Sequence, residues 1–242
     1  MELWPLLVCC ATRMEMEPLL KGLEDAAPVP LPYGAGVAGT LAGRPVHACW
    51  FGLGKANTAA GLALAIRELN PAAVIQVGIG GSFAGAGPAV GAVAIATEEL
   101  HLDLGVRGDD YFEDLQAMGF PLLPDDAGGT IYNRLPVSAP LAQRLARAGE
   151  TGGVPVQLVP FGTAETVTGS ETQARHTGRR AGVAVESMEG AAAAQVCLAL
   201  GVPFAELRGI SNLVGVRDKG QWRIGEALQG AHAVLHAFLQ HA

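Results

Sequence analysis

The segment 183–212 constrains the fold of this 242-residue chain more than any other part of it. An apolar, β-branched run ends in Glu186-Ser187-Met188-Glu189, an Ala-rich stretch follows, and a second apolar run ends in Ser211-Asn212. This order predicts a strand, an acidic turn, a helix and a second strand. Ligands of open α/β sheets bind outside the carboxyl ends of the strands. A carboxylate from Glu189 and a carboxamide from Asn212, brought to one sheet edge, suit a small polar molecule with hydroxyls and a heterocycle.

The rest of the chain alternates strand and helix patterns, which predicts one α/β domain over residues 1–242. We expect strands at 6–11, 73–77, 92–97 and 154–159, a hairpin of 37–41 and 46–51, and helices at 15–23, 57–69, 141–148 and 224–239. Residues 163–170 are rich in threonine and predict an extended segment. Residues 101–135 are irregular and carry several aromatic side chains, which is typical of a lid or a pocket wall.

The composition excludes several classes of protein. Half of the residues are hydrophobic, so a large buried core needs no disulfide or metal to stabilise it. A formal charge of −7 argues against a nucleic-acid partner. No stretch resembles a membrane span or a secretory signal, and none of the four cysteines forms a C-x-x-C pair. We therefore expect a cytoplasmic protein whose cysteines are reduced and buried, with Cys9 and Cys10 on opposite faces of a strand.

Two glycine-rich segments leave a structural and a functional interpretation open. Gly78-Ile79-Gly80-Gly81 follows a predicted strand, but Phe83 stands where a dinucleotide fingerprint needs its third glycine. Gly54-Lys55 lacks the remaining residues of a P-loop. The first segment is either a tightly packed turn or a place where the backbone approaches a flat or sugar-like ligand.

Other candidate residues also have two interpretations. Glu15 and Glu17 follow the first strand, where they either favour a helix start or polarise a water molecule. Met188 is either core or ligand wall, and Asn212 either a turn residue or a ligand contact. His232 and His236 are four residues apart without a further ligand nearby, so we expect no metal site.

The motifs together resemble those of the purine nucleoside phosphorylase and nucleosidase superfamily. The resemblance rests on Met188-Glu189 after a Val-rich strand, on the ending Arg208-Gly209-Ile210-Ser211-Asn212, and on the acidic motif at 13–17. Within the superfamily, the segment 186–192 and Arg217-Asp218 with Trp222 are most similar to futalosine hydrolases. This resemblance implies a three-layer αβα fold with a mixed, mostly parallel, partly barrel-like central sheet. It also implies a homodimer or larger assembly that cleaves a nucleoside without metal or organic cofactor.

The resemblance also implies residue roles. Glu17 would activate the attacking water, Glu189 would bind the ribose hydroxyls, and Met188 would pack against the sugar. Asn212 would contact the purine. The remaining expected substrate contacts are Ile79, Gly80, Thr168 and Ser211. Adenine-specific nucleosidases of the superfamily carry an aspartate where Asn212 stands, and an amide can donate to a 6-oxopurine such as hypoxanthine.

Futalosine hydrolysis is therefore the leading hypothesis, and three alternatives stay open. They are a methylthioadenosine/S-adenosylhomocysteine nucleosidase, a purine nucleoside phosphorylase, and a catalytically silent nucleoside-binding protein. Two carboxylates after the first strand would repel phosphate, whereas Arg13 keeps phosphorolysis possible. Arg107 and Arg134 are candidates for the cationic anchor of a carboxyphenyl group at the non-purine end.

Overall fold

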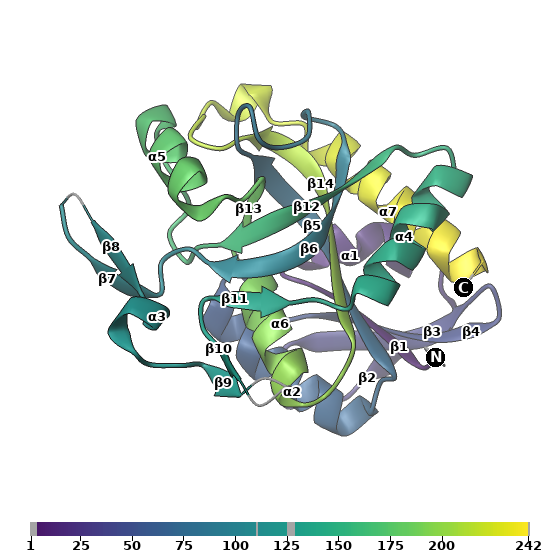
Figure 1. Cartoon of the computed structure of the whole chain (residues 1–242). Coiled ribbons are helices and arrows are strands. Elements are labelled where there is room, and N and C mark those ends of the chain that lie inside the picture. The colour runs from purple at the N-terminus through teal and green to yellow at the C-terminus, as the bar shows by residue number, and fades with distance from the viewer. Residues whose placement is uncertain (1–3, 110, 125–128, 242) are drawn as a thin grey trace.

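A ten-stranded mixed sheet forms the centre of the protein (Figure 1). The computed structural model describes residues 4–109, 111–124 and 129–241. The strands of the sheet are β1 (Leu6–Cys10), β2 (Glu24–Val29), β3 (Ala35–Leu41), β4 (Arg44–Trp50), β5 (Ala73–Ser82), β6 (Val93–His101), β11 (Arg134–Pro136), β12 (Val156–Thr163), β13 (Val185–Ser187) and β14 (Phe204–Leu213). Two small sheets pair β7 (Gly105–Arg107) with β8 (Phe112–Asp114) and β9 (Leu123–Pro124) with β10 (Thr130–Ile131).

Part of this sheet closes into a barrel. The strands follow the order β11-β6-β12-β13-β5-β1-β4-β3-β2, and β14 pairs with both β5 and β6. The β14–β5 pair is parallel and the β14–β6 pair is antiparallel. The ring β5-β13-β12-β6-β14 therefore leaves no free edge among its members. The expected α/β class with a mixed, partly barrel-like sheet is confirmed.

Helices cover both faces of the sheet, as Figure 1 shows. They are α1 (Arg13–Leu20), α2 (Lys55–Leu69), α3 (Leu115–Met118), α4 (Ala139–Thr151), α5 (Glu171–Ala181), α6 (Gly190–Ala199) and α7 (Ile224–His241), with a 3₁₀ turn at Lys219–Gln221. Alternate residues of β1 enter different cores. Leu6 and Val8 pack with α1, α4 and α7, whereas Leu7 and Cys9 pack with α2 and α6. Cys9 and Cys10 do face opposite sides, and all four cysteines are free and buried.

The glycine-rich segment 78–81 is part of a strand. Sequence periodicity predicts that the strand ends at residue 77, but β5 continues to Ser82. It continues because Gly78, Gly80 and Gly81 pair with β14, and Gly81 and Ser82 pair with β13. A Cβ atom at Gly80 would lie 2.8 Å from Cγ1 of Val185, so the absence of a side chain permits this close packing. The turn interpretation is wrong, and the interpretation as a close backbone approach remains.

Two elements carry no clear pattern in the sequence. Strand β2 is exposed except at Val29, and its ladder joins it to β3 at the end of the sheet. Helix α5 is mostly polar, and its N-cap Ser170 accepts from the N–H of Gln173. Neither has the strong apolar periodicity on which sequence reasoning depends.

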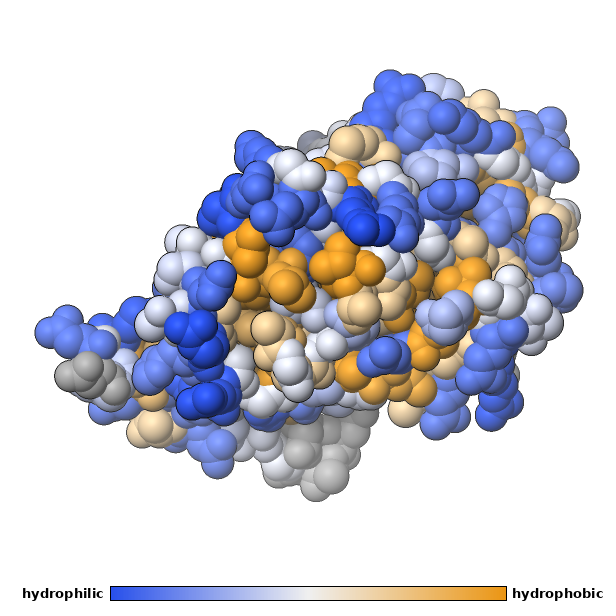
Figure 2. Space-filling model, turned by 90° about the horizontal axis from the view of Figure 1, so that it is seen from above, coloured by the Kyte–Doolittle hydropathy of each residue, from blue (hydrophilic) through white to orange (hydrophobic). Residues whose placement is uncertain are grey.

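The outer surface carries both polar and apolar areas. Viewed from above Figure 1, hydrophilic side chains surround an apolar area in the middle of the molecule (Figure 2). Within residues 4–109, 111–124 and 129–241, no helix is long and apolar enough to cross a membrane.

Candidate active site

A cavity of about 270 Å³ lies where β1, β5, β13 and β14 end. We call it the carboxylate cavity, because three glutamates line it. Its wall includes Thr12, Met14, Glu15, Leu53, Ile79, Gly80, Gly81, Thr168, Glu186, Met188, Glu189, Arg208, Ser211, Asn212, Arg217 and Trp222. Every site residue expected from the sequence lies on this wall except Glu17. The segments 78–81, 186–189 and 208–212 thus converge from distant parts of the chain.

Glu189 is the N-cap residue of α6 and is almost fully buried. The N–H of Gly54 donates to its Oε1 at 3.1 Å, and Nη2 of Arg208 donates to its Oε2 at 3.2 Å. Burial raises the pKa of Glu189, and the Arg208 guanidinium limits that rise. Two fixed donors hold this carboxylate at the cavity wall in one orientation.

Arg208 is the cation inside this group of acids. Its Nε donates to Oε1 of Glu206 at 2.6 Å, and its Nη1 donates to the carbonyl oxygen of Ile79 at 3.1 Å. Burial works against its charge, but the neighbouring carboxylates, led by Glu206, outweigh that effect and raise the pKa of Arg208. Sequence reasoning gave Arg208 no role. Its signal was an arginine two residues after a glutamate on one face of an otherwise apolar strand.

Glu15, and not Glu17, is the acid of the first-strand motif that reaches the cavity. Thr12 caps α1, and its N–H and hydroxyl both donate to Oε2 of Glu15. Oε1 of Glu15 accepts from the N–H of Ile79 at 3.3 Å. A Cβ atom at Gly78 would lie 2.7 Å from this Oε1 and 2.6 Å from Nη1 of Arg208, so the two side chains meet beside that glycine.

The structure places Glu17 outside the cavity, which corrects the expectation for this residue. Two residues along an α-helix correspond to about 200° of rotation, so Glu15 and Glu17 point in nearly opposite directions. Glu17 is half-exposed, and its Oε2 lies 3.8 Å from Nε of Arg13. The Thr12-x-x-Glu15 capping box was the missed signal, because it starts the helix two residues before the predicted start.

Thr168 and Glu186 form a second buried polar pair on the wall. The hydroxyl of Thr168 donates to Oε1 of Glu186 at 2.6 Å, and the Thr168 N–H donates to Oε2 at 3.1 Å. Burial raises the pKa of Glu186, and these two hydrogen bonds limit the rise. Thr168 therefore holds the carboxylate of Glu186, to which the sequence analysis assigned no role of its own.

The amide of Asn212 has a defined orientation. Its Nδ2 donates to the carbonyl oxygen of Leu213 at 2.9 Å, which leaves Oδ1 facing the Ser211 hydroxyl at 2.8 Å. That hydroxyl also lies 3.2 Å from the carbonyl oxygen of Gly80. One N–H of the Asn212 amide is then left to donate to a bound molecule.

Apolar side chains complete the wall. Met14, Leu53, Met188 and Trp222 line the cavity together with the acids. The indole N–H of Trp222 donates to the carbonyl oxygen of Val216, and the Arg217 guanidinium lies 5.1 Å from the indole ring centre. The cavity thus combines hydrogen-bonding groups with surfaces for a ring system.

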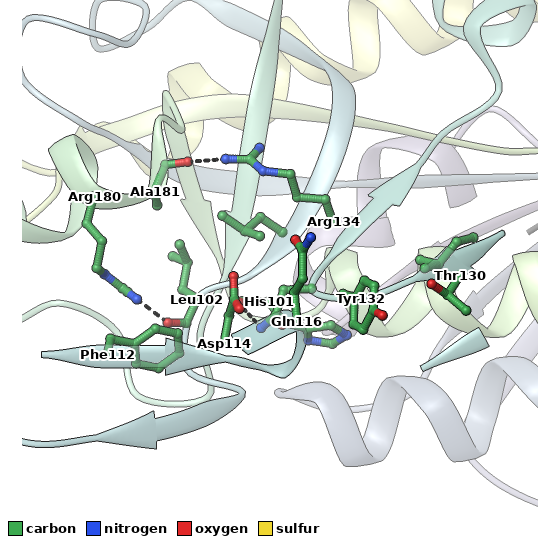
Figure 3. A pocket seen from close by; sticks show the side chains of 13 residues that line it. His101, Leu102, Phe112, Asp114, Gln116, Thr130, Tyr132, Arg134, Arg180 and Ala181 are labelled. Carbon is green, nitrogen blue, oxygen red and sulfur yellow. Dashed lines mark hydrogen bonds between the residues drawn. The ribbon is translucent and has the colours of Figure 1, made fainter. Parts of the chain in front are cut away.

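The irregular segment 101–135 lines a different cavity. This β8–β11 cavity, of about 330 Å³, is lined by Leu100, His101, Leu102, Phe112, Asp114, Gln116, Thr130, Ile131, Tyr132, Asn133, Arg134, Arg180 and Ala181 (Figure 3). Arg134 donates to the carbonyl oxygen of Ala181, and Arg180 donates to that of Leu102 (Figure 3). Neither Arg107 nor Arg134 lines the carboxylate cavity, so the structure does not support them as anchors for a ligand there.

Comparison with known protein families explains this convergence. Residues 5–241 match the family model of the Phosphorylase superfamily. The chain belongs to the phosphorylase superfamily. Two curated relatives are similar to this chain. Futalosine hydrolase of Thermus thermophilus is 40% identical over 179 residues, which are 73% of each chain. Futalosine hydrolase of Acidothermus cellulolyticus is 31% identical over 233 residues, which cover 96% of this chain and 88% of the relative.

Solved structures share the fold of this chain. Neisseria meningitidis 5′-methylthioadenosine/S-adenosylhomocysteine nucleosidase, in complex with methylthio-immucillin-A, superposes with a TM-score of 0.84. The alignment covers 98% of this chain and 99% of that one, with 24% sequence identity. At this level of identity the likeness establishes the architecture alone.

Proposed function

We propose that this protein hydrolyses the N-glycosidic bond of futalosine, releasing hypoxanthine and dehypoxanthine futalosine. The observation that carries the proposal is the meeting of Glu15, Glu189 and Asn212 on the wall of one cavity. The two curated futalosine hydrolase relatives support the same substrate. Menaquinone biosynthesis, a cytoplasmic location and a homo-oligomeric state belong to this proposal as its finer parts.

The sugar binds against Glu189 and Met188. A buried carboxylate that already accepts two fixed hydrogen bonds has lone pairs left for the 2′- and 3′-hydroxyls of ribose. Held in this way, the sugar can develop the positive charge of an oxocarbenium-like transition state beside an anionic group. Met188 supplies the apolar surface under the ring.

Glu15 takes the place that the sequence interpretation gave to Glu17. Its carboxylate lies beside Gly78 and Ile79, with Thr12 holding its second oxygen. In this position it accepts a proton from a water molecule that attacks the anomeric carbon. The Nη1 of Arg208 is close to Gly78 as well. Arg208 therefore orients Glu15 and Glu189 around the anomeric carbon.

Asn212 selects the base. The free N–H of its amide donates to O6 or N7 of a 6-oxopurine, with Ser211 fixing which end of the amide points outward. An amide does not release a proton at neutral pH, so a water molecule or another group protonates the leaving purine. Ile79, Gly80 and Thr168 form the remaining contacts of the proposed site.

Water suits the cavity better than phosphate. Three carboxyl groups line it, and Arg208 is already paired with Glu189 and Glu206. Arg13, the residue that kept phosphorolysis open, is exposed and lies beside Glu17 and the Trp50 ring. A phosphate ion would therefore meet more negative than free positive charge.

A nucleoside panel tests the proposal. Futalosine, methylthioadenosine, S-adenosylhomocysteine and inosine are incubated with the purified protein, with and without phosphate, and the products are separated by chromatography. We expect hypoxanthine from futalosine at a rate independent of phosphate. Adenine release from methylthioadenosine as the fastest reaction would contradict the proposal, as would a requirement for phosphate or the absence of any turnover.

A further inference from the structure

Two glutamates outside the carboxylate cavity are among the most deeply buried polar residues of the protein. Glu99 on β6 and Glu206 on β14 both have side chains without solvent exposure. They lie on strands that close the barrel, beneath the first turn of α6. Carboxyl groups are rarely buried unless a partner compensates for the loss of water.

Each of the two has one well-defined partner. Oε1 of Glu206 accepts from Nε of Arg208 at 2.6 Å. Oε2 of Glu99 accepts from the hydroxyl of Thr163 at 2.8 Å. The second oxygens, Oε1 of Glu99 and Oε2 of Glu206, have no donor within the described part of the chain.

These two second oxygens face each other. A Cβ atom built on Gly190 would lie 2.1 Å from Oε2 of Glu206 and 2.3 Å from Oε1 of Glu99, so both oxygens converge on the space that this glycine leaves empty. Two carboxylate oxygens in contact repel each other, whereas one proton between them gives a strong hydrogen bond. The guanidinium of Arg208 donates to Glu206, whereas Glu99 accepts from a neutral hydroxyl, so this geometry favours a shared proton on Glu99. Burial first, and the Glu206 charge second, raise the pKa of Glu99 well above its usual range.

Each glutamate of the pair is linked to Glu189 in the carboxylate cavity, Glu206 through Arg208 and Glu99 through Thr163. Arg208 bridges Glu206 to Glu189, the proposed ribose-binding carboxylate. Thr163, the partner of Glu99, accepts from the N–H of Ala191 in the first turn of α6, the helix that Glu189 caps. Among the described titratable groups, Cys9 on β1 interacts with Glu206, and Glu15 on α1 interacts with Arg208. His101, two residues after Glu99 on β6, has its Nε2 beside the side-chain oxygen of Gln195.

We propose that Glu99 and Glu206 are positioning residues: Glu99 donates its proton to Glu206, and this fixed hydrogen bond keeps Arg208 aligned on Glu189. The inference deepens the proposed function and rests on it for the role of Glu189. A neutral Glu99 lets Glu206 direct its single negative charge at Arg208. A charged Glu99 would compete for that guanidinium and draw it away from Glu189.

Three variants separate this role from simple packing. Glu99→Gln keeps a neutral donor toward Glu206 and an acceptor for Thr163, and we expect kcat/KM for futalosine within about tenfold of the unsubstituted protein. Glu99→Leu has a similar size but no donor. Glu206→Gln removes the charge that holds Arg208. For these two we expect kcat/KM to fall on the order of 10²-fold, with KM raised because the sugar is held less well.

Infrared spectroscopy can detect the proposed proton on Glu99 directly. We expect the C=O stretching band of a protonated, buried carboxylic acid at pH 8 in the unsubstituted protein and its loss in Glu99→Gln. No such band, a band that survives in Glu99→Gln, or equal activity of Glu99→Gln and Glu99→Leu would each overturn the proposal. The band needs no substrate, so its absence would leave the proposed function standing. If the band is present but the nucleoside panel fails, the proposed function falls and the buried hydrogen bond stands.

Discussion

The carboxylate cavity and the β8–β11 cavity hold their charges in different ways. In the first, Glu15, Glu189 and Arg208 are at most 5% exposed and are fixed by one another or by backbone N–H groups. In the second, Arg134 and Arg180 are partly exposed and donate to carbonyl oxygens of their own chain. Buried charges oriented in advance can stabilise a transition state, whereas exposed charges that satisfy the backbone mainly stabilise the fold. The comparison therefore favours the carboxylate cavity for the proposed chemistry.

The largest expected effect separates the two acids of helix α1. Glu15→Gln should lower kcat for futalosine by roughly 10²–10⁴-fold, because it removes the proposed general base from the cavity. Glu17→Gln is the matched control on the same helix and should leave kcat unchanged, since Glu17 lies on the outer face. Steady-state kinetics of both variants tests which of the two glutamates is the general base. Loss of activity in Glu17→Gln alone would restore the original assignment.

A smaller effect concerns the choice of base. Asn212→Asp should slow hypoxanthine release from futalosine by about 10–10²-fold, because the variant loses the donor to the 6-oxopurine. Relative to futalosine, it should process methylthioadenosine better than the unsubstituted protein does. The ratio of the two kcat/KM values measures this shift. An unchanged ratio would remove Asn212 as the residue that selects the base.

The third prediction concerns stability and pH. The folded protein keeps the Glu99 proton above pH 4.5, at which the unfolded chain releases it, so the free energy of unfolding falls as pH rises from there toward the folded pKa. Glu99→Gln does not titrate. Its stability relative to the unsubstituted protein should therefore increase with pH above that point, with a slope on the order of 1.4 kcal/mol per pH unit. Urea denaturation at several pH values measures the difference, and a difference that stays constant with pH would contradict the buried proton.

The smallest effect is expected in the β8–β11 cavity. Arg134→Gln removes a partly exposed ion pair with Glu98 and should change the free energy of unfolding by no more than about 1 kcal/mol. Turnover of futalosine should be unchanged. A large loss of kcat/KM in this variant would show that the second cavity takes part in substrate binding, and the distinction between the two cavities would fail.

Several parts of the site could be predicted because short-range patterns carry them. Met188, Glu189, Ser211 and Asn212 follow apolar runs, and strand periodicity alone brings such residues to the end of a sheet. Their position on the cavity wall is the one expected. Glu15 was missed for an equally local reason. The resemblance placed the base at Glu17, and two residues along a helix turn the side chain by about 200°, so the cavity receives Glu15 instead.

Other features depended on neighbours that are distant in the sequence. The segment 78–81 has the composition of a turn, yet β13 and β14 pair with it and keep it extended. Arg208 and Glu206 are charged residues in an apolar strand, and only their position beside Glu189 and Glu99 shows how each charge is compensated. No pattern within β14 identifies those partners.

The sequence by itself determined the α/β class, the two strand ends that carry Glu189 and Asn212, and the state of the cysteines, because periodicity and residue type act over a few positions. The tertiary structure decided which acid of helix α1 enters the cavity, how β14 closes the barrel, and that the carboxyl groups of Glu99 and Glu206 meet beside Gly190. Those outcomes depend on the burial and charge of groups brought together from distant segments, and electrostatic energy in a protein interior is set by distance in space.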